Sequence, residues 1–220
     1  MHKDDIENNI QRYNERFDQF GYSPKSLGWA KGKQDIRFDV LTSLYDFNNK
    51  SVLDIGCGFG DLNKTLTRKA EKYSYLGCDL CENLIEEGKT IFPNAEFVVG
   101  NILDIDFTNR IDWAVASGPF NHKFEKTDNY DFIESVMKKA YDSVKDGFSF
   151  DFISDKVDYK ENNLFYSSPE KLLSLAYKLS RNVVLRSDYM PFEFAIFVFK
   201  DDSFDKSDTI FGKYKRDKNI

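Results

Sequence analysis

The first fifty residues carry a pattern of apolar positions typical of helices. Apolar side chains recur there at steps of three and four residues, which is the spacing of one helix face: Ile6, Ile10, Tyr13 and Phe17. Glycine and proline then interrupt the pattern between residues 20 and 32, which predicts a loop. A second amphipathic helix is expected over residues 34–45, with four side chains on its apolar side: Ile36, Val40, Leu41 and Leu44. The sequence therefore predicts a helical N-terminal extension, or lid, over residues 1–48.

Beyond residue 49 the pattern changes to short apolar runs that alternate with helical stretches. Strands are expected over residues 51–55, 73–78, 96–99, 112–116 and 148–153, and helices over residues 62–70, 84–92 and 130–143. Along the last of these strands Phe148, Phe150 and Phe152 alternate, which places them on one face. Such regular alternation of strands with helices indicates a parallel sheet that is covered by helices on both faces.

The C-terminal third departs from that alternation. After a helix that starts at Pro169, two strand-like runs, 183–189 and 192–200, are separated by only a couple of residues. So short a connection cannot cross over between parallel strands, so the two runs form a hairpin and one strand is antiparallel to the rest. The predicted fold class is a doubly wound α/β sheet of about seven strands with this C-terminal strand hairpin. Residues 201–220 are expected to form a surface tail, and the chain is expected to be a single domain overall.

The strongest chemical signal is the segment VLDIGCGFGDL, which lies where the first predicted strand turns into a helix. Three glycines alternate through it: Gly56, Gly58 and Gly60. Glycine permits a tight turn there and lets a ligand approach the backbone closely. The segment differs from the dinucleotide fingerprint, which would require glycine where this chain has Asp61. Asp54 adds a carboxylate that would repel a pyrophosphate and attract an ammonium group, so the segment predicts a nucleoside-cofactor turn.

The run Asp54-x-Gly56-x-Gly58-x-Gly60 resembles motif I of the class I S-adenosylmethionine-dependent methyltransferases. The resemblance covers roughly residues 35 to 200 and implies a Rossmann-like domain over residues 49–200 that binds S-adenosyl-L-methionine. It further implies that Asp79, at the end of the second predicted strand, accepts hydrogen bonds from both ribose hydroxyls. Leu80, which follows it, would pack on the adenine.

Two further segments match the pattern of that family. Asn101 follows the third predicted strand, and the resemblance implies a contact between its side chain and the adenine amino group. Ser117 and Gly118 follow the fourth strand and would face the transferred methyl group. The cofactor contacts implied in this part of the chain, with Cys57 contributing its backbone, are Asp54, Gly56, Cys57, Gly58, Leu62, Asp79, Leu80, Asn101, Ile102 and Ser117.

More loosely, the flanking segments resemble bacterial methyltransferases of surface-glycan or natural-product pathways. The similar segments are SPKSLGW, ASGPFN, LFYSSPEKLLSLA and SDYMPFEFAIFVFK. This resemblance implies a small polar acceptor, methylated at an oxygen of a sugar or natural-product intermediate. The alternatives are an RNA or protein methyltransferase, an aminopropyltransferase or nicotinamide enzyme of the same fold, and a non-catalytic subunit that keeps the fold for binding.

Three residues outside the motifs are further candidates. His122 lies just beyond the fourth strand, near where the family places acceptor groups, and its intrinsic pKa suits a general base. The alternative for His122 is a surface loop histidine. Arg37 could bind the methionine carboxylate of the cofactor, and Trp29 could close over the cofactor as part of a lid. The alternatives are an exposed helix charge for Arg37 and a packing anchor for Trp29.

Charge and composition narrow the range of partners. The chain has 31 Lys and Arg against 37 Asp and Glu, a net charge of −6, which disfavours a nucleic-acid partner. No apolar run is long enough for a membrane helix, and the N-terminus does not resemble a secretory signal, so a cytoplasmic protein is expected. No metal site is predicted, because the pair Cys78 and Cys81 has no matching half. Aromatic residues make up 16% of the chain and gather outside residues 51–118, so they are expected to wall an acceptor pocket.

Overall fold

The computed structural model describes residues 1–29, 33–107, 111–204, 206–207 and 209–214. Its helices are α1 (Lys3–Phe20), α2 (Gln34–Leu41), α3 (Leu62–Lys69), α4 (Glu82–Ile91), α5 (Asn129–Ser143), α6 (Pro169–Tyr177) and the short 3-10 helix η1 (Gly212–Tyr214). Its strands are β1 (Lys50–Ile55), β2 (Tyr73–Asp79), β3 (Glu96–Val99), β4 (Ile111–Ala116), β5 (Val144–Ile153), β6 (Val183–Arg186) and β7 (Glu193–Phe199).

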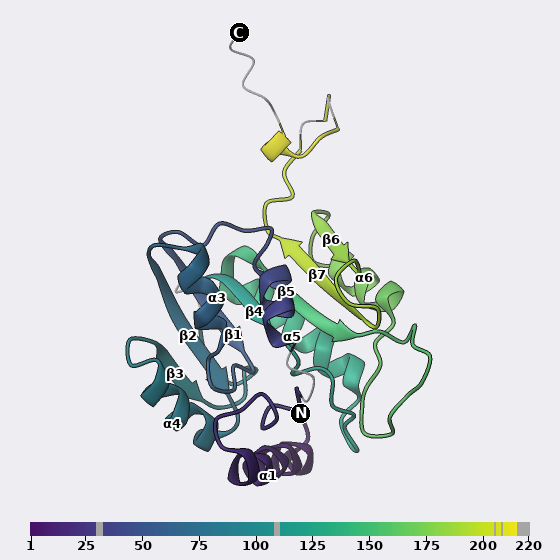
Figure 1. Cartoon of the computed structure of the whole chain (residues 1–220). Helices are drawn as coiled ribbons and strands as arrows, with labels where there is room; N and C mark the ends of the chain where they lie inside the picture. Colours follow the sequence, from purple (N-terminus) through teal and green to yellow (C-terminus); the bar gives the residue numbers. More distant parts are fainter. Residues whose placement is uncertain (30–32, 108–110, 205, 208, 215–220) are drawn as a thin grey trace.

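One seven-stranded sheet organises the chain, with the strand order β3-β2-β1-β4-β5-β7-β6 (Figure 1). Strands β1 to β5 pair in parallel, whereas β7 runs antiparallel to both β5 and β6. The predicted doubly wound α/β sheet with an antiparallel C-terminal strand is therefore confirmed. The strand order reverses between β1 and β4, and α1 lies across the carboxyl ends of the strands at that point (Figure 1).

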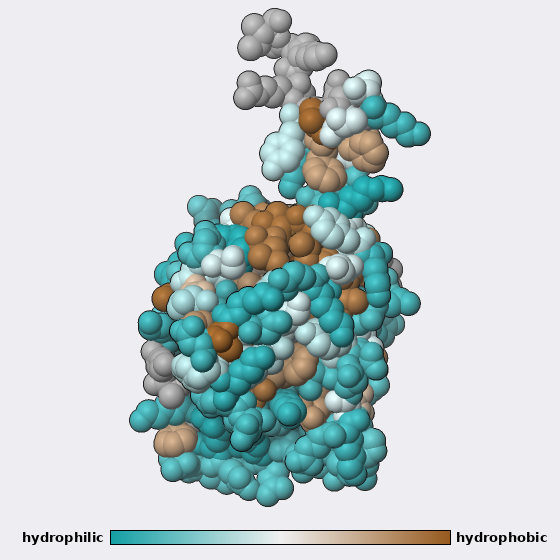
Figure 2. All heavy atoms as spheres, turned by 90° about the vertical axis from the view of Figure 1, so that its right-hand side faces the viewer, coloured by the Kyte–Doolittle hydropathy of each residue, from teal (hydrophilic) through white to brown (hydrophobic). Residues whose placement is uncertain are grey.

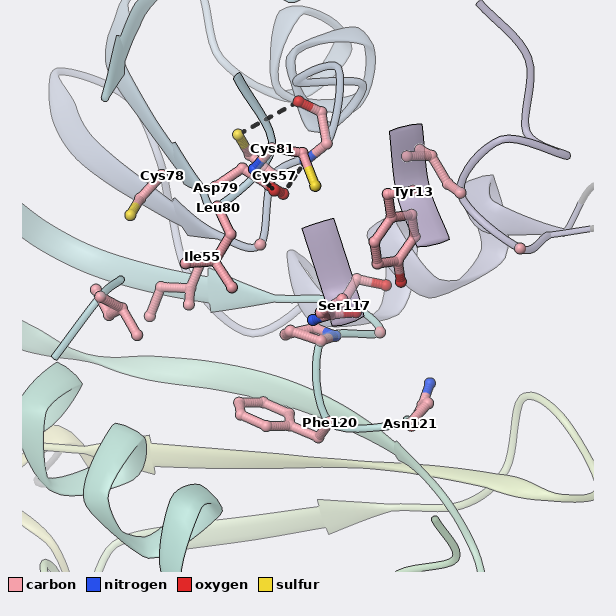
Figure 3. Close-up of a pocket in the computed structure, with 18 of the residues that line it drawn as sticks. Tyr13, Ile55, Cys57, Cys78, Asp79, Leu80, Cys81, Ser117, Phe120 and Asn121 are labelled. Atoms are coloured by element: carbon pink, nitrogen blue, oxygen red, sulfur yellow. Dashed lines mark hydrogen bonds between the residues drawn. The ribbon is translucent and has the colours of Figure 1, made fainter. Parts of the chain in front are cut away.

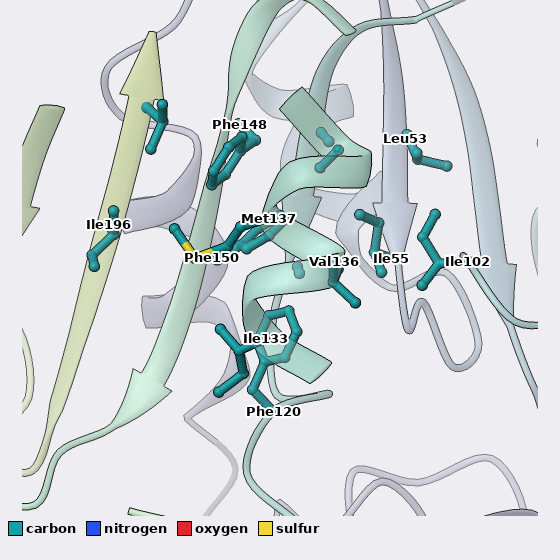
Figure 4. Packing of buried hydrophobic residues seen from close by; sticks show 14 of the residues in the cluster. Leu53, Ile55, Ile102, Phe120, Ile133, Val136, Met137, Phe148, Phe150 and Ile196 are labelled. Carbon is teal, nitrogen blue, oxygen red and sulfur yellow. The ribbon is translucent and has the colours of Figure 1, made fainter. Parts of the chain in front are cut away.

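The core on one face of the sheet packs beneath α5 and α6. Ile133, Val136 and Met137 of α5 lie against aromatic and aliphatic side chains of the strands (Figure 4). All three phenylalanines predicted to share a face of β5 are buried in this cluster: Phe148, Phe150 and Phe152. The ring centroids of Phe148 and Phe150 lie 4.4 Å apart. The alternation read from the sequence therefore placed these side chains correctly.

The opposite face packs beneath α2 and α3, and here the prediction for the second helix needs correction. Helix α2 ends at Leu41 rather than near residue 45, and Thr42 caps it by hydrogen bonding back to Phe38. Ile36 and Leu44, both predicted on the apolar side, are 40% and 41% exposed. The buried residues of α2 are instead Arg37, Phe38, Val40 and Leu41. Because the helix stops early, Leu44 no longer lies on a helix face.

Two strand boundaries also differ from the prediction. Strand β5 begins at Val144, four residues earlier than expected, because Ile111 of β4 pairs with Val144 and recruits a Lys-Asp-Gly stretch of low strand propensity. Strand β6 ends at Arg186, so the hairpin connection covers residues 187–192 and is longer than expected. Of the predicted loop and tail, residues 30–32, 205, 208 and 215–220 lie outside the described residues.

Figure 2 shows the side of the molecule where the edge strand β6 and helix α6 lie. That face is mostly hydrophilic, and its largest hydrophobic area lies beside the base of the C-terminal tail (Figure 2). The tail is drawn away from the sheet and contains a bridge between Phe204 and Phe211. In the described part of the chain, no helix has the length and apolar character needed to cross a membrane.

Candidate active site

A pocket opens at the carboxyl ends of the strands, beneath α1. Its walls come from the ends of β1, β2 and β4, from the loop before α2, and from α1 itself (Figure 3). Together with its open mouth it encloses about 1370 Å³ of space. In doubly wound sheets ligands bind at this topological position, where the strand order reverses.

The glycine turn forms the floor of the pocket. Gly56 has a φ of +67°, a left-handed conformation that glycine adopts without strain. A β-carbon at Gly56 would also lie 2.9 Å from the side chain of Pro119, so the turn packs tightly against the segment after β4. Cys57 and Gly58 line the pocket beside it. The structure therefore brings Gly56, Cys57 and Gly58 to one cavity, whereas Gly60 packs against Phe97.

Leu62 is the exception among the predicted motif residues. It does not line the pocket, because its side chain is fully buried in the core beneath the turn. Its position is the first residue of α3, where an inward-facing leucine packs beside Val52 and Leu66. The predicted cofactor contact of Leu62 is corrected to a role in holding the turn on the sheet.

Asp54 is a buried carboxylate on the pocket wall. It is 3% exposed, and its Oδ2 accepts a hydrogen bond of 2.8 Å from the Tyr75 hydroxyl. Burial, with the nearby carboxylates Asp79 and Asp61, raises the pKa of Asp54 to about 7, and the hydrogen bond from Tyr75 partly offsets the rise. A cation beside Asp54 would favour its charged form. The geometry therefore provides a position for a positively charged group.

Asp79 is held in a fixed orientation at the end of β2. Its Oδ2 accepts a hydrogen bond from the Gly58 N–H at 2.8 Å, and its Oδ1 accepts one from the Cys81 N–H at 2.9 Å (Figure 3). Burial raises the pKa of Asp79, and these N–H donors counteract the rise. A carboxylate has about four acceptor sites, so Asp79 can still accept bonds from hydroxyls. Leu80 lines the pocket beside it.

The loop after β3 supplies two more lining residues. The Asn101 side-chain oxygen accepts a hydrogen bond of 3.2 Å from the Leu103 N–H, which fixes the start of the loop. Ile102 is 6% exposed and presents an apolar surface to the pocket. Both predicted residues therefore reach the same cavity as Asp79.

The carboxylate of Asp151, near the end of β5, positions both Ser117 and Gly118. The Ser117 hydroxyl donates to Asp151 Oδ2 at 2.6 Å, and the Gly118 N–H donates to Asp151 Oδ1 at 2.8 Å. Asp151 is 1% exposed, and burial raises its pKa to about 7. A possible signal in the sequence was a charged residue between the buried Phe150 and Phe152 of β5.

Arg37 does not reach the pocket. Its guanidinium is 6% exposed and forms a two-pronged ion pair with Glu193, in which Nε donates to Oε2 at 2.7 Å. The alternative of an exposed helix charge is therefore wrong, and the carboxylate partner of Arg37 is a residue of the protein. Trp29 does line the pocket, with its ring 4.0 Å from the Arg37 guanidinium and against Gly118. The role of Trp29 in a lid stays a prediction.

His122 also lies outside the pocket lining. Its Nδ1 is 2.5 Å from an Arg12 side-chain nitrogen, which has hydrogens only to donate. Burial and the positive charge of Arg12 lower the pKa of His122. A neutral imidazole whose lone pair already accepts from a guanidinium is poorly placed to take a proton from a substrate. The geometry therefore disfavours His122 as the general base.

Helix α1 contributes lining residues that sequence reasoning missed. Asn9, Arg12 and Tyr13 all line the pocket, and Tyr13 enters it from the α1 side (Figure 3). Their spacing of three and four residues puts them on one helix face. The sequence pattern had identified this helix from its apolar residues alone, among them Tyr13. The signal in the sequence was the polar pair Asn9 and Arg12, three residues apart and just before Tyr13.

The cysteines of the site are buried free thiols. Cys57, Cys78 and Cys81 all line the pocket and are free. Burial raises the pKa of each thiol, to about 12 for Cys78. In the part of the chain that the structure describes, no group of three or more His, Cys, Asp or Glu side chains could hold a metal ion.

Comparison with known proteins decides the family. A methyltransferase domain matches residues 52–147, which hold the glycine turn, Asp79 and Asn101. A protein of Mycobacterium tuberculosis named as a methyltransferase is 30% identical over 158 aligned residues, covering 68% of this chain and 93% of that protein. The chain belongs to the class I S-adenosylmethionine-dependent methyltransferases. Its cofactor is therefore S-adenosyl-L-methionine.

Two further comparisons bear on this methyltransferase. The crystal structure of magnesium protoporphyrin IX methyltransferase from Synechocystis with bound S-adenosylmethionine has the same fold, with a TM-score of 0.66 at 11% identity. The alignment covers 90% of this chain and 98% of that one. The U6 snRNA methylphosphate capping enzyme of Drosophila melanogaster is 32% identical over 126 residues, covering 50% of this chain but 42% of that enzyme.

The residues of the methyltransferase fit this cofactor. S-adenosyl-L-methionine carries positive charge on its sulfur and its amino group, and the pocket has the buried carboxylate Asp54 and the half-buried carboxylate Asp79 on its wall. Its ribose offers hydroxyl donors, and Asp79 keeps free acceptor sites. The turn at Gly56 brings the backbone into the cavity where a side chain at that position would not fit.

Proposed function

We propose that this methyltransferase moves a methyl group from S-adenosyl-L-methionine to an oxygen of a small polar acceptor. The observation that carries the proposal is the continuity of one pocket. The same cavity runs from the carboxylates at the ends of β1 and β2 to Asn9, Arg12 and Tyr13 of α1. A cofactor bound at the strand ends would leave the α1 side for an acceptor, and a helix across the opening favours a small molecule.

The roles of the cofactor residues follow from their contacts. We infer that Asp79 accepts hydrogen bonds from the ribose hydroxyls and that Leu80, Asn101 and Ile102 surround the adenine. Asp54 would face the cofactor's ammonium group, because a buried carboxylate with a raised pKa gains most from a neighbouring cation. The cofactor supplies a methyl group already activated by a positively charged sulfur.

The remaining acceleration comes from placement. Ser117 and Gly118, both fixed by Asp151, line the pocket between the cofactor residues and α1. Holding an acceptor oxygen in line with the methyl group can supply on the order of 7–11 kcal/mol of the barrier reduction. Trp29 would close the pocket over Gly118 and exclude water.

RNA methylation is a second candidate, because one relative is named as a U6 snRNA capping enzyme. The net charge of −6 weighs against it, since RNA binding depends on basic surface. The aromatic side chains Phe120, Phe124 and Phe132 give part of the pocket an apolar lining, in keeping with the predicted aromatic walls. A small organic molecule fits such a lining better than a phosphate backbone does.

Calorimetry with S-adenosylhomocysteine, the demethylated product, tests the cofactor assignment. We expect micromolar binding to the wild-type chain and a loss of at least tenfold in Asp79→Ala, because charged hydrogen bonds contribute roughly 1.5–3 kcal/mol. Asp142→Ala is the matched control, since Asp142 is an exposed aspartate on α5. The acceptor class is tested by incubating the protein with methyl-tritiated cofactor and separated cell fractions. Label in the RNA or protein fraction instead of the small-molecule fraction would contradict the proposal.

A further inference from the structure

The α1 side of the pocket has its own chemistry, distinct from that of the cofactor residues. Its lining combines two polar side chains with aromatic ones: Asn9, Arg12, Tyr13, Phe120, Phe124 and Phe132. Below, this set is called the acceptor end. The carboxylates that line the pocket, Asp54 and Asp79, lie at the ends of β1 and β2, and among the described residues no histidine lines it.

Arg12 carries an unbalanced positive charge at the acceptor end. Its side chain is partly buried, and the polar contact it makes is with Nδ1 of a histidine whose pKa is lowered. Among the described residues no carboxylate lies within ion-pair distance of Arg12, whereas the buried Arg37 is paired with Glu193. A guanidinium presents a planar fork that matches the two oxygens of a carboxylate or phosphate. Arg12 is therefore arranged to bind an anion from the pocket.

Asn9 adds a second unsatisfied group on the same helix face. Its side-chain oxygen is buried and has no hydrogen-bond partner. Leaving such an acceptor unpaired costs roughly 1–3 kcal/mol, so a bound molecule with a hydroxyl or N–H group would relieve that cost. Asn9 and Arg12 lie three residues apart, which places both on the pocket side of α1.

The acceptor end also lacks a general base. Tyr13 is its one titratable residue besides Arg12 among those described, and burial raises the pKa of the Tyr13 phenol. A phenol that stays protonated at neutral pH cannot take a proton from a hydroxyl acceptor. An acceptor that is already an oxyanion needs no base, since it has no proton to lose.

We propose that the acceptor is a small organic acid, with a carboxylate or phosphate-type group on an apolar ring or chain, and that Arg12 binds this group. The proposal rests on the methyltransferase function proposed above. One oxygen of the acid stays on Arg12 while another donates a lone pair to the methyl carbon. The methyl–sulfur bond breaks with its electron pair left on sulfur, so the product is a neutral or less charged methyl ester and no proton moves.

Binding of simple probes to the chain saturated with S-adenosylhomocysteine tests this proposal without turnover. We expect calorimetry to detect benzoate or phenyl phosphate at least tenfold more tightly than the neutral benzamide, as a charge-assisted contact predicts. The tighter of the two anions tells a carboxylate acceptor from a phosphate-type one. Equal binding of benzamide and both anions, or no binding of either anion at millimolar concentration, would overturn the proposal.

Variants of Arg12 locate the anion. Arg12→Gln is expected to weaken the preferred anion about tenfold or more while the affinity for S-adenosylhomocysteine stays within twofold, which also shows that the variant folds. Arg12→Lys keeps the charge but loses the fork, so an intermediate affinity is expected. Lys3→Gln, which removes an exposed charge from the same helix, is the matched control and should change nothing. An anion affinity unchanged in Arg12→Gln would place the site elsewhere. Failure of the wild-type chain to bind S-adenosylhomocysteine would instead contradict the proposed function itself.

Discussion

The Asp151 carboxylate accepts hydrogen bonds from both the Ser117 hydroxyl and the Gly118 N–H, at 2.6 and 2.8 Å. It thereby ties the end of β5 to the segment that follows β4, where the pocket lies. Glu193 and Arg37 are the charged neighbours of Asp151, and the Tyr189 hydroxyl lies close enough to sense its charge. The pocket wall is thus supported from behind by a buried set of charges.

The protonation of Asp151 predicts a pH-dependent stability. Its pKa is about 7 in the folded chain, because of burial, and near 4 when unfolded. Between these values the folded state binds more protons, so the free energy of unfolding falls as pH rises from about 4 to 7. Asp54, whose pKa is also raised to about 7, adds to the same slope.

Asp151→Asn should remove part of this slope, at most about 1.4 kcal/mol per pH unit. An amide can accept from Gly118 and donate to Ser117, so the variant keeps its contacts. Urea unfolding at pH 5, 6 and 7 measures the effect, with the exposed Asp142→Asn as control. If the free energy of unfolding changed with pH equally in wild type and Asp151→Asn, the pKa of Asp151 would not be raised by folding.

The contact between Gly118 and Trp29 predicts a steric effect on the pocket. Gly118 has a φ of +91°, and a β-carbon there would lie 2.5 Å from the Trp29 ring. Gly118→Ala should therefore displace Trp29, with a loss of about 1–3 kcal/mol in stability from the strained backbone. Tryptophan fluorescence reports the displacement, because the other tryptophan, Trp113, is fully buried. As a control, adding Gly118→Ala to the Trp29→Phe variant should leave its fluorescence spectrum unchanged. A spectrum unaltered by Gly118→Ala alone would mean that Trp29 does not pack there.

The pairing of Arg37 with Glu193 predicts that Arg37 supports the fold rather than the cofactor. Glu193→Gln leaves a buried guanidinium without its countercharge, so a loss of roughly 3–5 kcal/mol is expected in urea unfolding. The affinity of the folded Arg37→Lys variant for S-adenosylhomocysteine should stay within about twofold, since Arg37 does not line the pocket. A tenfold weaker affinity in Arg37→Lys would instead support the carboxylate clamp expected from the sequence.

The fold was predictable because its signals are local and repeated. The period-two pattern at Phe148, Phe150 and Phe152 and the short hairpin connection each specify a strand or its direction without distant information. The same holds for the first part of the glycine turn, where Gly56, Cys57 and Gly58 reach one cavity because they adjoin in sequence.

The errors arose where the partner of a residue lies far away in the sequence. Arg37 and Glu193 are 156 positions apart, and nothing local to Arg37 shows that its charge is balanced within the protein. Leu62 follows the motif directly, but whether it faces a ligand or the core depends on how α3 packs on the sheet. The pocket role of Asn9 and Arg12 likewise depends on how α1 docks.

Asp5 attaches α1 to residues 125–127, the segment just before α5. Its buried carboxylate accepts hydrogen bonds from the N–H groups of Glu125, Lys126 and Thr127 and from the Thr127 hydroxyl. Asp5→Ala would leave these donors without that partner, at a cost of roughly 1–3 kcal/mol for each one that water cannot reach. We expect α1 to detach, which should make the N-terminus sensitive to limited proteolysis and weaken any ligand that contacts Arg12.

The adjacent Asp4 provides a matched control for Asp5. Asp4 is exposed and pairs with the exposed Lys126, and such surface pairs contribute little to stability. Asp4→Ala should therefore leave both the proteolysis pattern and the unfolding midpoint close to those of the wild type. If Asp4→Ala and Asp5→Ala behaved alike, the attachment of α1 would depend on the net charge of its first turn rather than on the buried contacts of Asp5. Greater sensitivity in Asp5→Ala alone would show that those contacts hold α1 over the pocket.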